Sequence, residues 1–125
     1  MTKKRLIVQL WQTNLKSLEL ATTPFLIAMT ATAIDMDVEI HAIGHSVSFF
    51  MKYQPLLDQA ISSTNRPLRD YVDDAITCGV KICLCSAALH DRDIGEPLLR
   101  EGVEIIGMIS MLERATSPNT TVLTY

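Results

Sequence analysis

The stretch CGVKICLCSAALH, residues 78–90, decides the fold. Its apolar run at residues 80–85, interrupted only by Lys81, predicts a buried strand, and the small residues at 86–90 predict a turn into a helix. A buried strand that runs directly into a helix is typical of a parallel sheet flanked by helices. The stretch also holds the chain's three cysteines, Cys78, Cys83 and Cys85, so their chemistry has to be explained together with the fold.

Strand-like and helix-like segments alternate on both sides of this stretch. Short apolar segments predict four more strands, at residues 6–10, 38–43, 103–106 and 120–124. Three further helices are predicted. The first begins at Pro24, with Thr22 or Thr23 as its cap, and ends at about residue 35. The second follows Pro67, and the third covers residues 108–115. The helix after Pro67 has one apolar stripe at helical spacing, formed by Leu68, Tyr71, Val72, Ala75 and Ile76. This alternation predicts an α/β chain.

The predicted topology gathers several polar residues at one edge of the sheet. Right-handed crossovers between parallel strands place all the carboxyl ends of the strands along the same edge, where ligands bind in open α/β sheets. We expect Cys85, His45, the loop at residues 11–14 and the turn at Gly107 to lie there.

Length, charge and composition narrow the function classes. The 125 residues fit one domain, residues 1–125, and the 48% hydrophobic content with a mean hydropathy of +0.21 suggests subunit interfaces. The net charge is −3, and the 11 basic residues are scattered apart from Lys3, Lys4 and Arg5. This distribution argues against nucleic acid or an anionic membrane surface as a partner.

The amino-terminal segment predicts a cytoplasmic protein. The basic triplet at residues 3–5 runs directly into a strand without the cleavage region of a secretory signal. The longest apolar run, residues 25–34, is too short to span a bilayer and is interrupted by threonines. An odd number of cysteines also fits no secreted disulfide framework.

Cys85 is the candidate nucleophile. It ends the predicted strand before a helix that Ser86 can cap, and the free N–H groups of a helix start favour a thiolate. Cys83 points to the same face two residues earlier, about 6.6 Å away between Cα atoms, which makes a resting disulfide improbable and a packing role more natural. Cys78 is expected to pack as a small hydrophobe.

Metal binding is a minor interpretation, and a cofactor site is not expected. Cys83, Cys85, His45 and His90 could nominally supply four ligands, but a C-x-C pair within a strand cannot easily wrap one zinc ion. His45 and His90 are either solvated edge residues or groups that orient or protonate sulfur at Cys85. The five glycines form neither a phosphate-binding loop nor a dinucleotide fingerprint.

Several segments resemble the DsrE-like family (the DsrE/DsrF/DsrH group) of small cytoplasmic sulfur-relay proteins. They are GVKICLC at residues 79–85, SAAL at 86–89, GVEIIGMISMLERA at 102–115, TVLTY at 121–125 and ATTPFLIAMTATAIDMDVEIHAIG at 21–44. The resemblance implies a single three-layer α/β/α domain with a mainly parallel five-stranded sheet. It also implies a homotrimer or homohexamer, with the persulfide-carrying cysteine of the family at Cys85.

The expected role is therefore that of a sulfurtransferase-like carrier. It would accept sulfane sulfur from a TusA-like carrier or a rhodanese and deliver it to an acceptor protein, in sulfur oxidation or in thiolation. Two other interpretations stay open. One is a non-catalytic scaffold or binding subunit of the same fold, and the other is a thiol redox protein that cycles a Cys83–Cys85 disulfide.

Overall fold

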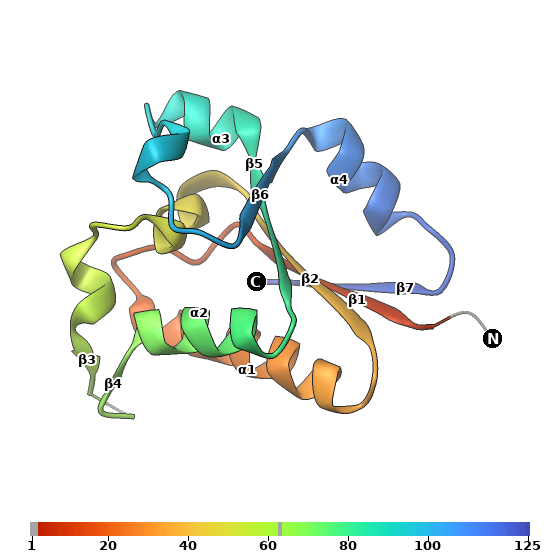
Figure 1. Cartoon of the computed structure of the whole chain (residues 1–125), viewed down its shortest axis with the longest axis horizontal. Helices are drawn as coiled ribbons and strands as arrows, with labels where there is room; N and C mark the ends of the chain where they lie inside the picture. Colours follow the sequence, from red (N-terminus) through yellow and green to blue (C-terminus); the bar gives the residue numbers. More distant parts are fainter. Residues whose placement is uncertain (1–2, 63) are drawn as a thin grey trace.

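The computed structural model describes residues 3–62 and 64–125. Its centre is a five-stranded sheet with the strand order β6-β5-β2-β1-β7 (Figure 1). Every neighbouring pair in this sheet is parallel. The strands are β1 (Arg5–Leu10), β2 (Asp37–Ala42), β5 (Lys81–Cys85), β6 (Val103–Ile106) and β7 (Thr120–Thr124). The five predicted strands and their parallel arrangement are confirmed.

Helices cover both faces of the sheet. Figure 1 shows α1 and α2 on one side of the sheet and α4 on the other, which confirms the α/β/α layering. The α-helices are α1 (Leu18–Ala33), α2 (Leu68–Thr77), α3 (Ser86–Asp91) and α4 (Met108–Ala115). The 3₁₀ helices are η1 (Gly44–Phe50), η2 (Pro55–Asp58) and η3 (Glu96–Leu98), and a small antiparallel hairpin joins β3 (Ala60–Ile61) to β4 (Arg66–Pro67).

The strand order explains why α4 lies apart from the other helices. From β1 the chain steps to β2, β5 and β6 in one direction across the sheet, and then returns past all of them to β7. Right-handed crossovers in one direction place their helices on one face, and a crossover in the reverse direction places its helix on the opposite face. The eight-residue helix α4 therefore packs on a face that α1 and α2 do not reach.

The main hydrophobic core lies between the sheet and helices α1 and α2. Alternate residues of β1, β2 and β5 point into it, as expected for strands whose side chains alternate between faces. These strand residues are Leu6, Val8, Leu10, Val38, Ile40, Ala42, Ile82 and Leu84, and they pack in one cluster with Phe25, Ala28, Leu68 and Val72. The amphipathic stripe predicted for the helix after Pro67 is the buried side of α2.

Helix α1 begins earlier than predicted. The sequence suggested a start at Pro24, but the helix starts at Leu18 after Ser17 and carries Pro24 inside it. Thr22 does not cap the helix, because its hydroxyl donates to the carbonyl of Glu19 at 2.9 Å. Tertiary packing explains the longer helix, since its buried or half-buried residues keep helical spacing across Pro24: Leu18, Ala21, Thr22, Phe25 and Ala28.

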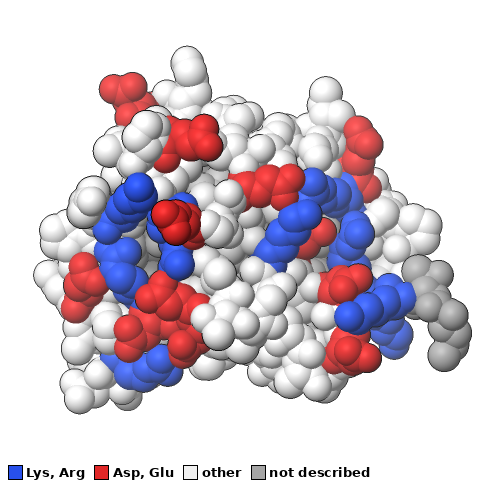
Figure 2. Space-filling view, in the orientation of Figure 1, with Lys and Arg blue, Asp and Glu red and all other residues white. Residues whose placement is uncertain are grey.

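Charged side chains are mixed on the surface. On the face drawn in Figure 2, Lys and Arg side chains lie beside Asp and Glu side chains and form no continuous basic surface. Ion pairs such as Arg66 with Asp74 at 2.7 Å and Arg69 with Asp58 at 2.6 Å neutralise these charges locally. Within residues 3–62 and 64–125, no helix has the length and apolar character needed to cross a membrane.

Candidate functional site

Cys85 lies at the carboxyl edge of the sheet. It is the last residue of β5 and the extended residue directly before α3, with φ −68° and ψ 120°. The turn after β6 approaches the same place, because a Cβ atom placed on Gly107 would lie 4.0 Å from the Oγ atom of Ser86. Ser86 is the first helical residue and makes no capping hydrogen bond, so the expected Ser86 cap is wrong.

The Cys85 side chain is covered in the single chain. The residue is 3% exposed and belongs to the core cluster, beside its register partner Ile106, which is also buried. The sequence placed this thiol correctly at the end of a strand and the start of a helix, but a nucleophile has to be reachable and this thiol is covered in the chain by itself. Packing at the strand end encloses it.

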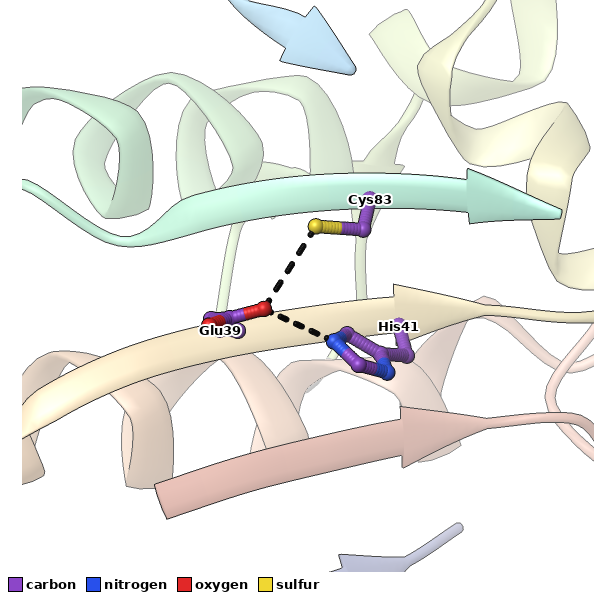
Figure 3. A group of neighbouring side chains, drawn as sticks. All are labelled: Glu39, His41 and Cys83. Atoms are coloured by element: carbon purple, nitrogen blue, oxygen red, sulfur yellow. Dashed lines mark hydrogen bonds and ion pairs between the residues drawn. The ribbon is translucent and has the colours of Figure 1, made fainter. Parts of the chain in front are cut away.

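Cys83 sits in a polar cluster on the face of the sheet that α4 covers. Figure 3 shows it with its neighbours Glu39 and His41. Its Sγ lies 3.6 Å from Oε1 of Glu39 and 3.4 Å from Nη1 of Arg114, and the residue is fully buried. Burial, reinforced by the Glu39 charge, raises the pKa of Cys83 from 9.0 to about 12. Cys83 is therefore a protonated thiol at neutral pH and a poor nucleophile.

Glu39 is the hub of this cluster. Its Oε1 accepts from Nε2 of His41 at 2.9 Å and from Nη1 of Arg114 at 3.0 Å, and its Oε2 lies 3.7 Å from Nε of Arg5. The hydrogen bond from His41 is the largest influence and, together with Arg114, outweighs burial and lowers the pKa of Glu39 from 4.5 to about 2. Glu39 is thus a buried carboxylate, held by hydrogen bonds from His41 and Arg114 and by an ion pair with Arg5.

His41 lies fully buried beside Glu39. Because its Nε2 donates to the Glu39 carboxylate, its Nδ1 is the atom without a hydrogen-bond partner. The strand register pairs His41 directly with Cys83, so both side chains project from the same face.

Glu39 and Arg114 were not singled out from the sequence. Glu39 and His41 are two residues apart in a strand, so they must share one face, and a carboxylate inside the apolar pattern DVEIHA was the available signal. Arg114 gave no such signal, because its contact depends on how α4 crosses strands that are 30 or more positions away.

The two predicted supporting histidines do not join the cysteines. The His90 side chain is 92% exposed, and its nearest charged neighbour is Asp91 at 3.9 Å. His45 is exposed and accepts from Nε of Arg92 at 3.3 Å. It also lines a pocket of about 290 Å³ with Asn14, Leu15, Lys16 and Ser48. Over residues 3–62 and 64–125, the metal-ligating side chains that do converge are instead Glu39, His41 and Cys83.

Cys78 occupies the opposite edge of the sheet. It caps the carboxyl end of α2 and is exposed, so the expected packing role is wrong. Together with the basic residues Lys3, Arg5 and Lys81 it lines a pocket of about 420 Å³ at the amino-terminal ends of the strands. All three cysteines are free thiols.

Three solved structures share the fold. A protein of unknown function from Methanobacterium thermoautotrophicum, MTH1491, is 14% identical, with a TM-score of 0.72 over 98% of this chain and 100% of that one. The ychN protein from E. coli is 19% identical, with a TM-score of 0.68 over 99% and 100%. BT1422 from Bacteroides thetaiotaomicron, a conserved protein of unknown function, is 13% identical, with a TM-score of 0.66 over 96% and 94%.

Sequence comparison gives the family. No curated protein matches the chain. The sequence profile of the DsrE/DsrF-like family, however, matches residues 10–124, which include the strand β5, both of its cysteines and the helix α4. Because the match spans nearly the whole chain, the protein belongs to the DsrE/DsrF-like family, whose members work in sulfur relay.

Proposed function

We propose that this protein carries sulfane sulfur as a persulfide on Cys85 and passes it to a partner protein in the cytoplasm. Membership of a sulfur-relay family supports this role, and the resemblance of residues 79–85 to the family's cysteine segment supports Cys85 as the carrier. The expected partners are a TusA-like carrier or a rhodanese as the donor and a protein thiol as the acceptor. A homotrimer or homohexamer is the proposed assembly.

The contrast between two neighbouring thiols carries the proposal. Cys83 is held against the Glu39 carboxylate, where its pKa of about 12 leaves almost no thiolate at neutral pH. Cys85 lies two residues further along the same face, at the strand end and outside this cluster. Of the two thiols in β5, Cys85 is therefore the one suited to attack a donor sulfur.

The transfer is an exchange between sulfur atoms without net oxidation. The Cys85 thiolate attacks the outer sulfur of the donor persulfide, a new S–S bond forms on Cys85, and the donor leaves as a thiolate. An acceptor thiolate then attacks the outer sulfur of the Cys85 persulfide, and Cys85 leaves as a thiolate again. His45 and His90 are proposed to assist from the surface, where they face an arriving partner rather than Cys85.

Access to Cys85 is the requirement that this mechanism must meet. At 3% exposure, its sulfur can be reached only if the junction of β5 and α3 opens, together with the turn at Gly107 that lies beside Ser86. Docking of a partner at this edge would supply that opening. The same burial is the observation that favours the second candidate function, a scaffold subunit in which Cys85 only packs.

Intact-protein mass spectrometry after incubation with a persulfide-loaded protein donor, a TusA-like carrier or a rhodanese, separates these functions, because the donor supplies both the sulfur and the docking partner. The exposed Cys78 is first replaced by serine, so that surface modification does not obscure the result. The carrier gains one sulfur atom in this background, keeps the gain in Cys83→Ser and loses it in Cys85→Ser. Absence of any sulfur adduct supports the scaffold. A loss of two hydrogen atoms without added sulfur supports a Cys83–Cys85 redox protein.

A further inference from the structure

The polar cluster under α4 contains metal-ligating side chains that sulfur transfer at Cys85 does not use. A carboxylate, an imidazole and a thiol converge there, all from buried residues, and Figure 3 shows their side chains directed at one another from β2 and β5. We propose that Glu39, His41 and Cys83 form a binding site for a divalent transition-metal ion of the Zn²⁺ type. This inference does not rest on the proposed function, because Cys83 is not the proposed sulfur carrier.

The spacing of the three ligand atoms fits one ion. A carboxylate oxygen of Glu39, a ring nitrogen of His41 and Sγ of Cys83 all lie within 4.8 Å of one another. The Glu39 oxygen is 2.9 Å from the His41 nitrogen and 3.6 Å from the Cys83 sulfur. In a tetrahedral zinc site with the usual bond lengths, such atoms are roughly 3.3–3.6 Å apart. Small rotations of the three side chains would therefore bring them to coordinating distances.

The donor set selects the class of metal. Thiolate sulfur and imidazole nitrogen favour zinc and neighbouring transition metals over magnesium or calcium, which prefer oxygen ligands. Three protein ligands leave a fourth position for water or another small ligand. Coordination requires that Cys83 release its proton to solvent and that the His41 proton move to Nδ1, the atom that has no other partner.

A cation already occupies the space beside these ligands. Nη1 of Arg114 lies 3.0 Å from the Glu39 oxygen and 3.4 Å from the Cys83 sulfur, so the guanidinium supplies the positive charge that a metal ion would supply. Its side chain is 23% exposed and also contacts Glu104, with Nη2 3.4 Å from Oε1. Arg114 can therefore move toward Glu104 and solvent when an ion binds, which makes arginine and metal competitors for Glu39.

Cobalt titration of the metal-free, reduced full chain tests the site, because a cobalt–thiolate bond gives a charge-transfer absorption in the near ultraviolet. We expect saturation at one Co²⁺ per chain, with the band displaced by Zn²⁺. Arg114→Gln should bind Co²⁺ more tightly by more than about tenfold, because a like charge next to the ion has been removed. Cys83→Ser should lose the band, while Cys78→Ser and Cys85→Ser should keep it.

The matched variants also show what would overturn the proposal. A band that survives in Cys83→Ser but disappears in Cys78→Ser or Cys85→Ser would place the metal on another thiol. Absence of the band in both the natural sequence and Arg114→Gln would exclude the site, and Arg114→Gln keeps all three ligands if Cys83→Ser fails to fold. Because Cys85→Ser tests sulfur loading separately, either proposal can fail without the other.

Discussion

The two faces of the sheet differ in how they are stabilised. Toward α1 and α2, the strands present aliphatic side chains such as Val8, Ile40 and Leu84, which pack without polar partners. Toward α4, the same strands present Glu39 and Cys83, whose burial depends on specific hydrogen bonds. Because apolar packing against α1 and α2 stabilises the fold, the opposite face of the sheet can hold buried reactive groups under the short helix α4.

The largest effect is expected on the aliphatic face. Leu84→Ala should lower the free energy of unfolding by about 2–5 kcal/mol, because it leaves a cavity in a fully buried position. Leu26→Ala on the outer side of α1, where Leu26 is 47% exposed, should cost about 1 kcal/mol or less. Urea unfolding of both variants measures the contrast, and equal losses would contradict the assigned core.

Acid should weaken the polar face specifically. As the pH falls, Glu39 of the unfolded chain is protonated near its ordinary pKa of 4.5. In the folded chain it stays ionised until the pH approaches its lowered pKa of about 2. The stabilisation from Glu39 is thus complete above pH 4.5 and is lost between about 4.5 and 2, with a size of about 3 kcal/mol. Glu39→Gln should lack this part of the pH dependence in urea unfolding. An identical acid profile for both proteins would show that Glu39 is not held as a carboxylate.

Arg114→Gln should lower the free energy of unfolding by about 1–3 kcal/mol, because it removes one hydrogen-bond donor from the buried Glu39 carboxylate. The hydrogen bond from His41 and the ion pair with Arg5 remain. The loss should shrink when Glu39→Gln is already present, since the two residues act as a pair. A double-mutant cycle by chemical unfolding gives this coupling. Strict additivity would mean that Arg114 does not support Glu39.

An exposed ion pair provides the smallest effect. Arg66 and Asp74 approach to 2.7 Å, but their side chains are 44% and 50% exposed. Asp74→Asn should therefore change the free energy of unfolding by less than about 1 kcal/mol, and added salt should reduce the change further. If this surface pair equalled the Arg114–Glu39 pair in unfolding measurements, burial would not explain the special role of the α4 face.

Most of the fold could be predicted from the sequence. The segments at residues 103–106, 108–115 and 120–124 have the predicted limits, because Gly102, Gly107 and the SPN turn at 117–119 separate them clearly. The start of α1 was missed because the usual preference of proline for the first turn was overridden by packing on both sides of Pro24.

The site was less accessible to sequence reasoning. The position of Cys85 followed from a local pattern, the end of an apolar run before small residues. The contacts of Cys83 did not, because they depend on the register that sets His41 beside Cys83 and on the path of α4 over both. The burial of Cys85 likewise depends on packing between distant segments, which alternation of apolar residues does not encode.

The most direct test of the central claim is to locate the sulfur within one sample. The Cys78→Ser protein is loaded by a persulfide-charged TusA-like carrier or rhodanese, blocked with an alkylating reagent and digested, and the modified residues at positions 83 and 85 are quantified by mass spectrometry. We predict persulfide on Cys85 and an intact thiol on Cys83, whose pKa is raised by burial and by the Glu39 charge. Persulfide on Cys83, or on neither residue, would contradict it.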